Sequence, residues 1–312
     1  MLILDAHCDT ITTIMKSGEG LQKNDCHIDL TRLKEFDSYV QFFAAFISPE
    51  HARMGALSRT LSIIDKLYQE ISLNKNDITL CRNYQDIIKA EQDKKVAAVL
   101  TIEGGEALEG SLPALRMLYA LGVRGMTLTW NYRNQIADGV LDGISKGGLT
   151  PFGREVVGEM NRLGMLVDIS HLSETGFWDV ISLSKAPIIA SHSNAKKLCS
   201  HVRNLTDRQL LALKETGGVT GLNLYPLFLA DSGKATIKDA VSHIEYIVSL
   251  TGEDTLGLGS DFDGIECAPE GLEGVQFYPV LLNELLKLNY SEDLVRKIAG
   301  GNFLRVIEEV LS

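Results

Sequence analysis

Several features that would assign a protein to a common class are missing from this 312-residue chain. No apolar stretch approaches the roughly 18–20 residues of a membrane span, and no charged segment followed by an apolar one opens the chain as a secretion signal would. Lys and Arg number 30 against 41 Asp and Glu, and no basic block occurs. We therefore expect no membrane anchor and no nucleic-acid partner, because phosphate binding needs clustered basic residues.

Cysteine is scarce and scattered. The five cysteines are odd in number and show no CxxC spacing, which argues against a disulfide framework or a thiolate metal site. Reduced thiols in a cytoplasmic protein fit this pattern better. The cysteines are Cys8, Cys26, Cys81, Cys199 and Cys267.

Repeats, low-complexity tracts and proline-rich linkers are also absent, so we expect residues 1–312 to form a single domain. What recurs is a short, nearly continuous apolar run followed by a helical pattern. Such runs predict strands buried on both faces of a parallel sheet. The eight runs are Leu2–Ala6, Tyr39–Ile47, Val96–Ile102, Val123–Leu128, Met165–Ile169, Pro187–Ala190, Gly218–Leu224 and Thr255–Leu258.

Amphipathic helices are predicted between these runs. Apolar residues at helical spacing occur over 57–71 and 237–248. Near the C-terminus we expect a helix that starts at Ser291 and stops at Gly300–Asn302, with Asn302 capping a last helix. Eight strand–helix alternations predict a (β/α)8 TIM barrel. A doubly wound open sheet is the alternative, although no GxGxxG turn follows the first strand.

Polar residues fall where the predicted strands end. In a (β/α)8 barrel the active site lies at the C-terminal ends of the strands. In strand order, the residues found there are His7, Asp9, Glu103, His171, His192, Tyr225, Asp261 and Asp263. Three of the chain's seven histidines thus lie at one rim with carboxylates between them, and we interpret His27, His51, His201 and His243 as structural or surface residues.

Imidazole and carboxylate without thiolate suit Zn²⁺ in a hydrolytic site, with Mn²⁺ and Fe²⁺ left open. His7, Asp9, Glu103, His171 and His192 are too many ligands for one catalytic zinc that keeps a position open. A bridging Glu103 would serve two ions. Two metal ions roughly 3.5–4 Å apart can hold a shared hydroxide and polarise a carbonyl, which is chemistry for amide or ester hydrolysis.

With these residues in view, the chain resembles the membrane dipeptidase (renal dipeptidase) family, peptidase family M19, as a bacterial member. Those enzymes are binuclear zinc hydrolases on a (β/α)8 barrel. The matching segments run through almost the whole chain: "DAHCDT", "TIEGGEAL", "DISHLS", "ASHSNA", "VRNLTD", "GSDFDG" and "GGNFLRVIEEV".

The resemblance implies a role for each matched residue. His7 and Asp9 would hold one zinc, His171 and His192 the other, and Glu103 would bridge them. Asp261 would act near the bridging water and the substrate amine. Arg203 would pair with the substrate's C-terminal carboxylate, assisted by Tyr225.

One departure from the family concerns the "LTWN" segment. The animal members have a histidine where this chain has Trp130, and that histidine is thought to steady the developing oxyanion. Trp can donate only through its indole N–H. We expect Trp130 or Asn131 to fill this role, or the substrate range to have moved.

Together these observations predict a cytoplasmic dipeptidase with two Zn²⁺ per chain, acting on dipeptides that include L-Xaa-D-Xaa such as L-Xaa-D-Ala. The alternative is a binuclear metal amidohydrolase acting on another small amide or lactam. A barrel that binds a ligand without turnover is disfavoured, because none of the five ligand positions is missing. A homodimer is left open.

Overall fold

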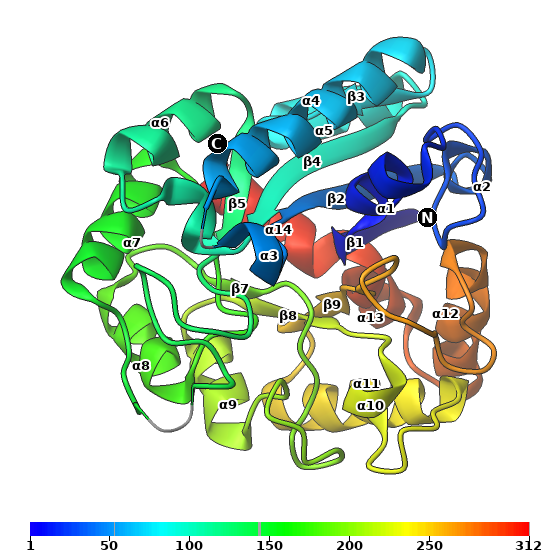
Figure 1. Cartoon of the computed structure of the whole chain (residues 1–312). Coiled ribbons are helices and arrows are strands. Elements are labelled where there is room, and N and C mark those ends of the chain that lie inside the picture. Colours follow the sequence, from blue (N-terminus) through cyan, green and yellow to red (C-terminus); the bar gives the residue numbers. More distant parts are fainter. Residues whose placement is uncertain (53, 143–144, 312) are drawn as a thin grey trace.

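The protein folds as a closed parallel barrel ringed by helices (Figure 1). The structure, a computed structural model, describes residues 1–52, 54–142 and 145–311. Hydrogen-bonded neighbours around the barrel run β1, β2, β4, β5, β6, β7, β8 and β9, which returns to β1. The pairing of β2 with β4, from Val40 with Ala97 to Phe46 with Glu103, lies within this closed ring. The predicted (β/α)8 barrel is confirmed, and the open sheet is wrong.

The strands are β1 (Leu2–Cys8), β2 (Ser38–Phe46), β3 (Ile78–Leu80), β4 (Val96–Glu103), β5 (Val123–Thr127), β6 (Leu166–Asp168), β7 (Ile189–Ala190), β8 (Val219–Leu222) and β9 (Leu256–Leu258). The short β3 pairs with the first residues of β4 and lies outside the ring of eight. Sequence analysis missed β3, because three residues are too few to give a periodic signal.

The helices are α1 (Thr10–Ser17), α2 (Leu30–Leu33), α3 (Pro49–Ala52), α4 (Ala56–Leu73), α5 (Tyr84–Gln92), α6 (Leu112–Ala120), α7 (Pro151–Leu163), α8 (Glu174–Leu183), α9 (Asp207–Glu215), α10 (Pro226–Leu229), α11 (Ile237–Thr251), α12 (Tyr278–Lys287), α13 (Glu292–Arg296) and α14 (Asn302–Val310). Two 3₁₀ turns are η1 (Gly105–Leu108) and η2 (Val275–Phe277). The expected helices over 57–71 and 237–248 are α4 and α11.

The strands are predominantly apolar because their two faces are both buried. Along β4, Ala97 and Val99 join a cluster that also contains Phe303 of α14, whereas Ala98 and Leu100 join the larger cluster that includes the surrounding helices. Successive side chains of a strand point to opposite faces, so a strand between two cores needs an unbroken apolar run. Helix α14 lies behind the strands at the centre of Figure 1.

The C-terminal helix does not stop where the sequence predicted. Helix α13 passes through a π turn (η3, Lys297–Gly301) directly into α14. The Asn302 side chain caps no helix, and its Nδ2 donates to the carbonyls of Glu253 and Leu256 at 2.7 Å each. A Cβ on Gly300 would lie 2.5 Å from Leu2 Cδ2, so this glycine permits close packing against β1 rather than ending a helix.

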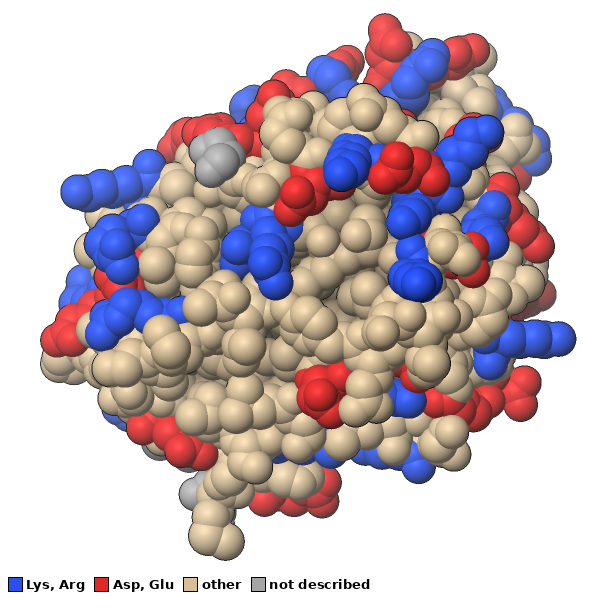
Figure 2. Space-filling view, turned by 90° about the horizontal axis from the view of Figure 1, so that it is seen from above, with Lys and Arg blue, Asp and Glu red and all other residues tan. Residues whose placement is uncertain are grey.

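The outer surface carries charges of both signs. On the face seen from above, Lys and Arg side chains lie among Asp and Glu side chains (Figure 2). Within the described residues, none of the helices combines the length and the apolar character needed to cross a bilayer.

Candidate metal centre

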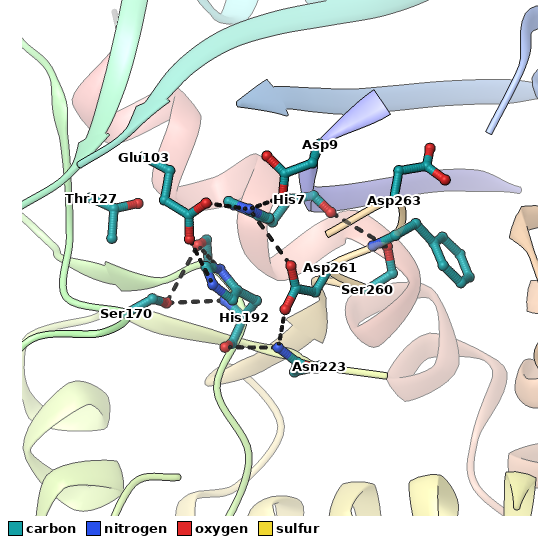
Figure 3. A network of polar contacts seen from close by, with 12 residues as sticks. His7, Asp9, Glu103, Thr127, Ser170, His192, Asn223, Ser260, Asp261 and Asp263 are labelled. Atoms are coloured by element: carbon teal, nitrogen blue, oxygen red, sulfur yellow. Dashed lines mark hydrogen bonds and ion pairs between the residues drawn. The ribbon is translucent and has the colours of Figure 1, made fainter. Parts of the chain in front are cut away.

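Six polar side chains from five strand ends converge at one end of the barrel, and Figure 3 labels five of them, all except His171. Each is at most 9% exposed, so a charge here is removed from water. The contributing elements are β1, β4, β6, β7 and β9 and the loops that follow them. The residues are His7, Asp9, Glu103, His171, His192 and Asp261. The structure therefore brings together the five sequence-predicted metal ligands and Asp261.

Glu103 lies between the imidazole of His7 on one side and those of His171 and His192 on the other, and turns one oxygen to each side. Its Oε2 is 3.5 Å from His7 Nε2. Its Oε1 is 2.9 Å from His171 Nε2 and 3.5 Å from His192 Nε2. A carboxylate presented in this way can serve a cation on each side.

The donor atoms form overlapping groups that fit cations. Glu103, His171 and His192 form one group, and His7, Asp9 and Glu103 form another. His7 Nε2 and Asp9 Oδ1 are buried without a hydrogen-bond partner. A buried polar atom with no partner is costly, and a cation between these atoms would satisfy them. The residues present therefore fit a pair of divalent ions.

The charges at the site favour a cation. Burial lowers the pKa of His7, but the carboxylates of Glu103 and Asp9 outweigh burial and raise that pKa well above its ordinary value. Burial lowers the pKa of His171 to about 4. Burial also raises the pKa of Asp9 to about 6, because its charge is held away from water. A metal ion at this position would stabilise the ionised form of Asp9 and would bind the neutral imidazole of His171.

Asp261 is held by a residue that sequence analysis did not identify. Asn223 Nδ2 donates to Asp261 Oδ2 at 2.9 Å, and Asp261 Oδ1 lies 3.9 Å from His7 Nε2. Burial raises the pKa of Asp261 to about 7. Asn223 lies in the predicted strand Gly218–Leu224, two residues before Tyr225, and that spacing was the signal that could have revealed it.

The side chain of Asn131 contacts His171, a predicted metal ligand. Its Oδ1 lies 2.8 Å from His171 Nδ1. An amide oxygen only accepts, so His171 carries its proton on Nδ1 and leaves Nε2 free to bind a cation. The predicted oxyanion role of Trp130 or Asn131 stays a prediction.

Arg203 is 4% exposed and lies against the site. Its Nη2 donates to the carbonyl of His192 at 3.0 Å and its Nη1 to Ser193 Oγ at 3.3 Å. Its Nε is buried without a partner. The hydrogen bonds to His192 and Ser193 thus fix the guanidinium in one orientation, as a group that binds a carboxylate through two hydrogen bonds requires.

A cavity of about 450 Å³ opens over the site, a volume suited to a small ligand. Trp130 and Tyr225 form part of its wall together with Arg203 and Asp261. The wall also contains His201, which the sequence analysis had interpreted as a structural or surface residue.

Asp263 turns away from the metal centre. Its Oδ1 lies 2.9 Å from His27 Nδ1, and its Oδ2 accepts from Thr10 Oγ1 at 2.6 Å. This contact ties the loop after β9 to the loop before α2.

Two site residues have left-handed backbones, His171 with φ 64° and Asp261 with φ 66°. Such conformations in non-glycine residues are uncommon and cluster at functional sites.

A parallel barrel with buried imidazoles and carboxylates at the C-terminal strand ends defines the class of metal-dependent hydrolase barrels. The family model of the membrane dipeptidases, peptidase family M19, matches residues 1–312. The chain belongs to this family and is a metallo-dipeptidase.

Individual relatives agree with the family assignment. A dipeptidase from Schizosaccharomyces pombe is 38% identical over 296 residues, covering 90% of this chain and 71% of the relative. A Klebsiella pneumoniae protein encoded in the pqqA 5′ region is 37% identical over 79% of this chain and 97% of its own length. A metallopeptidase from Rhodobacter sphaeroides, solved with a phosphinate mimic of L-Ala-D-Ala, superposes with a TM-score of 0.91 at 30% identity over 99% of both chains.

Proposed function

We propose that this chain hydrolyses the peptide bond of dipeptides, including L-Xaa-D-Xaa such as L-Xaa-D-Ala, and that it uses two Zn²⁺ ions. The observation that carries the proposal is the position of Glu103, whose Oε2 lies 3.5 Å from His7 Nε2 and whose Oε1 lies 2.9 Å from His171 Nε2. His7 and Asp9 would hold one ion, and His171 and His192 the other. The chemistry that such an ion pair supplies is activation of water at neutral pH and polarisation of the carbonyl.

The chain's own residues would hold the two ends of the substrate. Asp261 has one oxygen fixed by Asn223, so its other oxygen is free to accept from the substrate amine and to move a proton. Arg203 would pair with the terminal carboxylate, because its guanidinium is fixed and has donors to spare. Because Asp261 and Arg203 lie at a fixed separation, binding both charged ends of the substrate would select a dipeptide over a longer peptide.

The Rhodobacter sphaeroides relative supports a D-residue on the C-terminal side, because its bound ligand mimics L-Ala-D-Ala. In this chain the cavity wall also includes Trp130, Tyr225 and Phe46. Their apolar surfaces would surround the side chains of a short peptide, and the indole N–H of Trp130 would be the donor available to the carbonyl oxygen.

The test combines metal content with a substrate panel. Protein stripped with a chelator and re-loaded with zinc should hold about two ions per chain and cleave L-Ala-D-Ala. Separate re-loading with Mn²⁺ and Fe²⁺ identifies the metal that supports the highest kcat/KM. A single tightly held ion with full activity would overturn the two-metal proposal. Cleavage of lactams or N-acyl amino acids with no cleavage of dipeptides would establish the alternative amidohydrolase.

A further inference from the structure

We propose that Asp168 is a positioning residue which, through the hydroxyl of Ser191, holds His192 in the tautomer that can bind a cation. Asp168 touches neither the substrate cavity nor the proposed ions. This proposal rests on the metal centre of the proposed function. It assigns to Asp168 a role in orienting one of the proposed metal ligands without contacting the metal.

Asp168, the last residue of β6, is 4% exposed and accepts from four donors. Its Oδ1 accepts from the backbone N–H groups of Ser170 at 3.0 Å and Ser191 at 2.9 Å. Its Oδ2 accepts from two hydroxyls, Thr127 Oγ1 at 2.7 Å and Ser191 Oγ at 2.5 Å. With a donor on every side, the carboxylate of Asp168 acts as the acceptor in each of these hydrogen bonds.

This arrangement fixes the direction of the next hydrogen bond. Ser191 has one hydroxyl hydrogen, and that hydrogen points at Asp168. The Ser191 oxygen also lies 2.6 Å from His192 Nδ1, so it must accept there. His192 therefore carries its proton on Nδ1, and its Nε2 presents a lone pair.

That lone pair faces the proposed metal position. His192 Nε2 lies 3.5 Å from Glu103 Oε1 and 3.0 Å from His171 Nε2. His171 reaches the same tautomer through the amide oxygen of Asn131. The two imidazoles of this ion are thus oriented differently, one by a neutral amide and the other by a carboxylate acting through a hydroxyl. Groups that orient metal-binding histidines typically contribute about 10–100-fold in metal affinity.

The sharpest variant is Asp168→Asn, which keeps the shape and reverses the hydrogen bonds with the two hydroxyls. The new NH₂ group cannot face the two backbone N–H donors, so it takes the side of the two hydroxyls, which can rotate to accept. Ser191 then accepts from Asn and its hydrogen is free to donate to His192 Nδ1. That stabilises the Nε2–H tautomer, which cannot bind metal. We expect one of the two zinc ions to bind about 10–100-fold more weakly.

A matched control exists in the same barrel. Asp5 has the same four-donor environment: Ser260 N at 2.9 Å and His7 N at 3.2 Å on Oδ1, and Ser260 Oγ at 2.5 Å and Tyr278 OH at 2.6 Å on Oδ2. None of these hydrogen bonds reaches a histidine ring. Asp5→Asn should therefore lower stability to a similar degree and leave the affinity for both zinc ions close to that of the wild type.

Zinc affinity is measured by competition with a chromophoric chelator, and the unfolding temperature of each metal-free variant reports the fold. Ser191→Ala should lose affinity for one ion, and Ser191→Thr, which keeps the hydroxyl, should recover most of it. Two wild-type zinc affinities in folded Asp168→Asn would overturn the proposal, as would an equal loss in Asp5→Asn. If wild-type protein itself holds fewer than two ions, the two-zinc function fails instead.

Discussion

Gly264 lies directly against the carboxylate of Asp9. A Cβ built on Gly264 would stand 2.3 Å from Asp9 Oδ2 and 2.6 Å from Asp261 Oδ1. Only a residue without a side chain leaves both carboxylates in place. The loop after β9 thus determines where a predicted metal ligand from the end of β1 can sit.

Gly264→Ala should therefore displace Asp9 and Asp261. We expect at least a tenfold loss of kcat/KM on a dipeptide, weaker zinc binding, and a loss of stability of about 1–3 kcal/mol from overpacking. Gly158→Ala in α7 is the control, because nothing lies within 4 Å of the added methyl group. That variant should gain about 0.5–1 kcal/mol of stability, as glycine disfavours a helix interior. Full zinc affinity in Gly264→Ala would contradict this reading of the loop.

Glu103→Gln tests the proposed bridge. A glutamine can offer one oxygen to a cation, but its NH₂ group would donate to the imidazole nitrogens on the other side and compete with the second ion. We expect loss of at least one zinc ion, measured by metal analysis after dialysis, and of nearly all activity.

Glu106→Gln is the matched control for Glu103→Gln. Glu106 is also buried, at 7% exposed, but its carboxylate accepts from Asn134 Nδ2 at 3.1 Å and lies outside the histidine groups. This variant should keep both ions. Wild-type turnover in Glu103→Gln would place the reaction elsewhere.

Arg203 and the substrate carboxylate can be tested as a pair. Amidating a dipeptide's C-terminus should lower kcat/KM sharply in the wild type. Arg203→Ala should weaken free-acid dipeptides by about 2–5 kcal/mol, the typical effect of truncating one partner of a buried charge pair. The amidation penalty should shrink in this variant, because the group that senses the carboxylate is gone.

Arg208→Ala provides the control for Arg203→Ala. Arg208 is a nearby cation that lies over the Trp178 ring, 4.4 Å from its centroid, outside the catalytic cavity wall. It should leave the amidation penalty unchanged. An equal penalty in wild type and Arg203→Ala would show that Arg203 does not contact the carboxylate.

His243 should make the fold sensitive to acid. Its Nδ1 accepts from Ala195 N at 3.2 Å and its Nε2 donates to Leu229 O at 3.0 Å, so the folded state needs the neutral ring. Burial lowers the pKa of His243. As pH falls below about 6.5, the unfolded chain takes up this proton before the folded one, so stability is lost toward acid pH.

His243→Gln removes that proton uptake. In metal-free protein unfolded by urea, we expect this variant to be about 1–3 kcal/mol less stable at pH 7.5, because a buried hydrogen bond is lost. Its loss of stability between pH 7.5 and pH 5 should be smaller than that of the wild type. Parallel pH profiles for the two proteins would show that His243 does not titrate on unfolding.

The barrel could be predicted because eight runs with no polar face require burial on both sides. The metal-ligand candidates could be predicted because ligands at strand ends must meet at one rim, whatever the exact packing. His7 and Glu103, 96 positions apart in the chain, were placed together on that ground alone.

The supporting residues could not be found in the same way. Asp168 is the last residue of β6 and Asn223 directly follows β8, and only the packing of neighbouring strands shows which groups they contact. The course of the C-terminal helix also depended on packing, because Gly300 signals a helix stop in sequence but provides space beside β1 in the fold.

The left-handed backbones of His171 and Asp261 set a limit on engineering this enzyme. Glycine would adopt those conformations without the roughly 1–2 kcal/mol that an L-residue with a Cβ gives up in them. A search for thermostable variants by melting temperature alone would therefore favour replacing a proposed metal ligand and the proposed proton carrier. In this protein, selection for heat resistance must be coupled to selection for turnover, or it will enrich stable barrels that no longer cleave peptides.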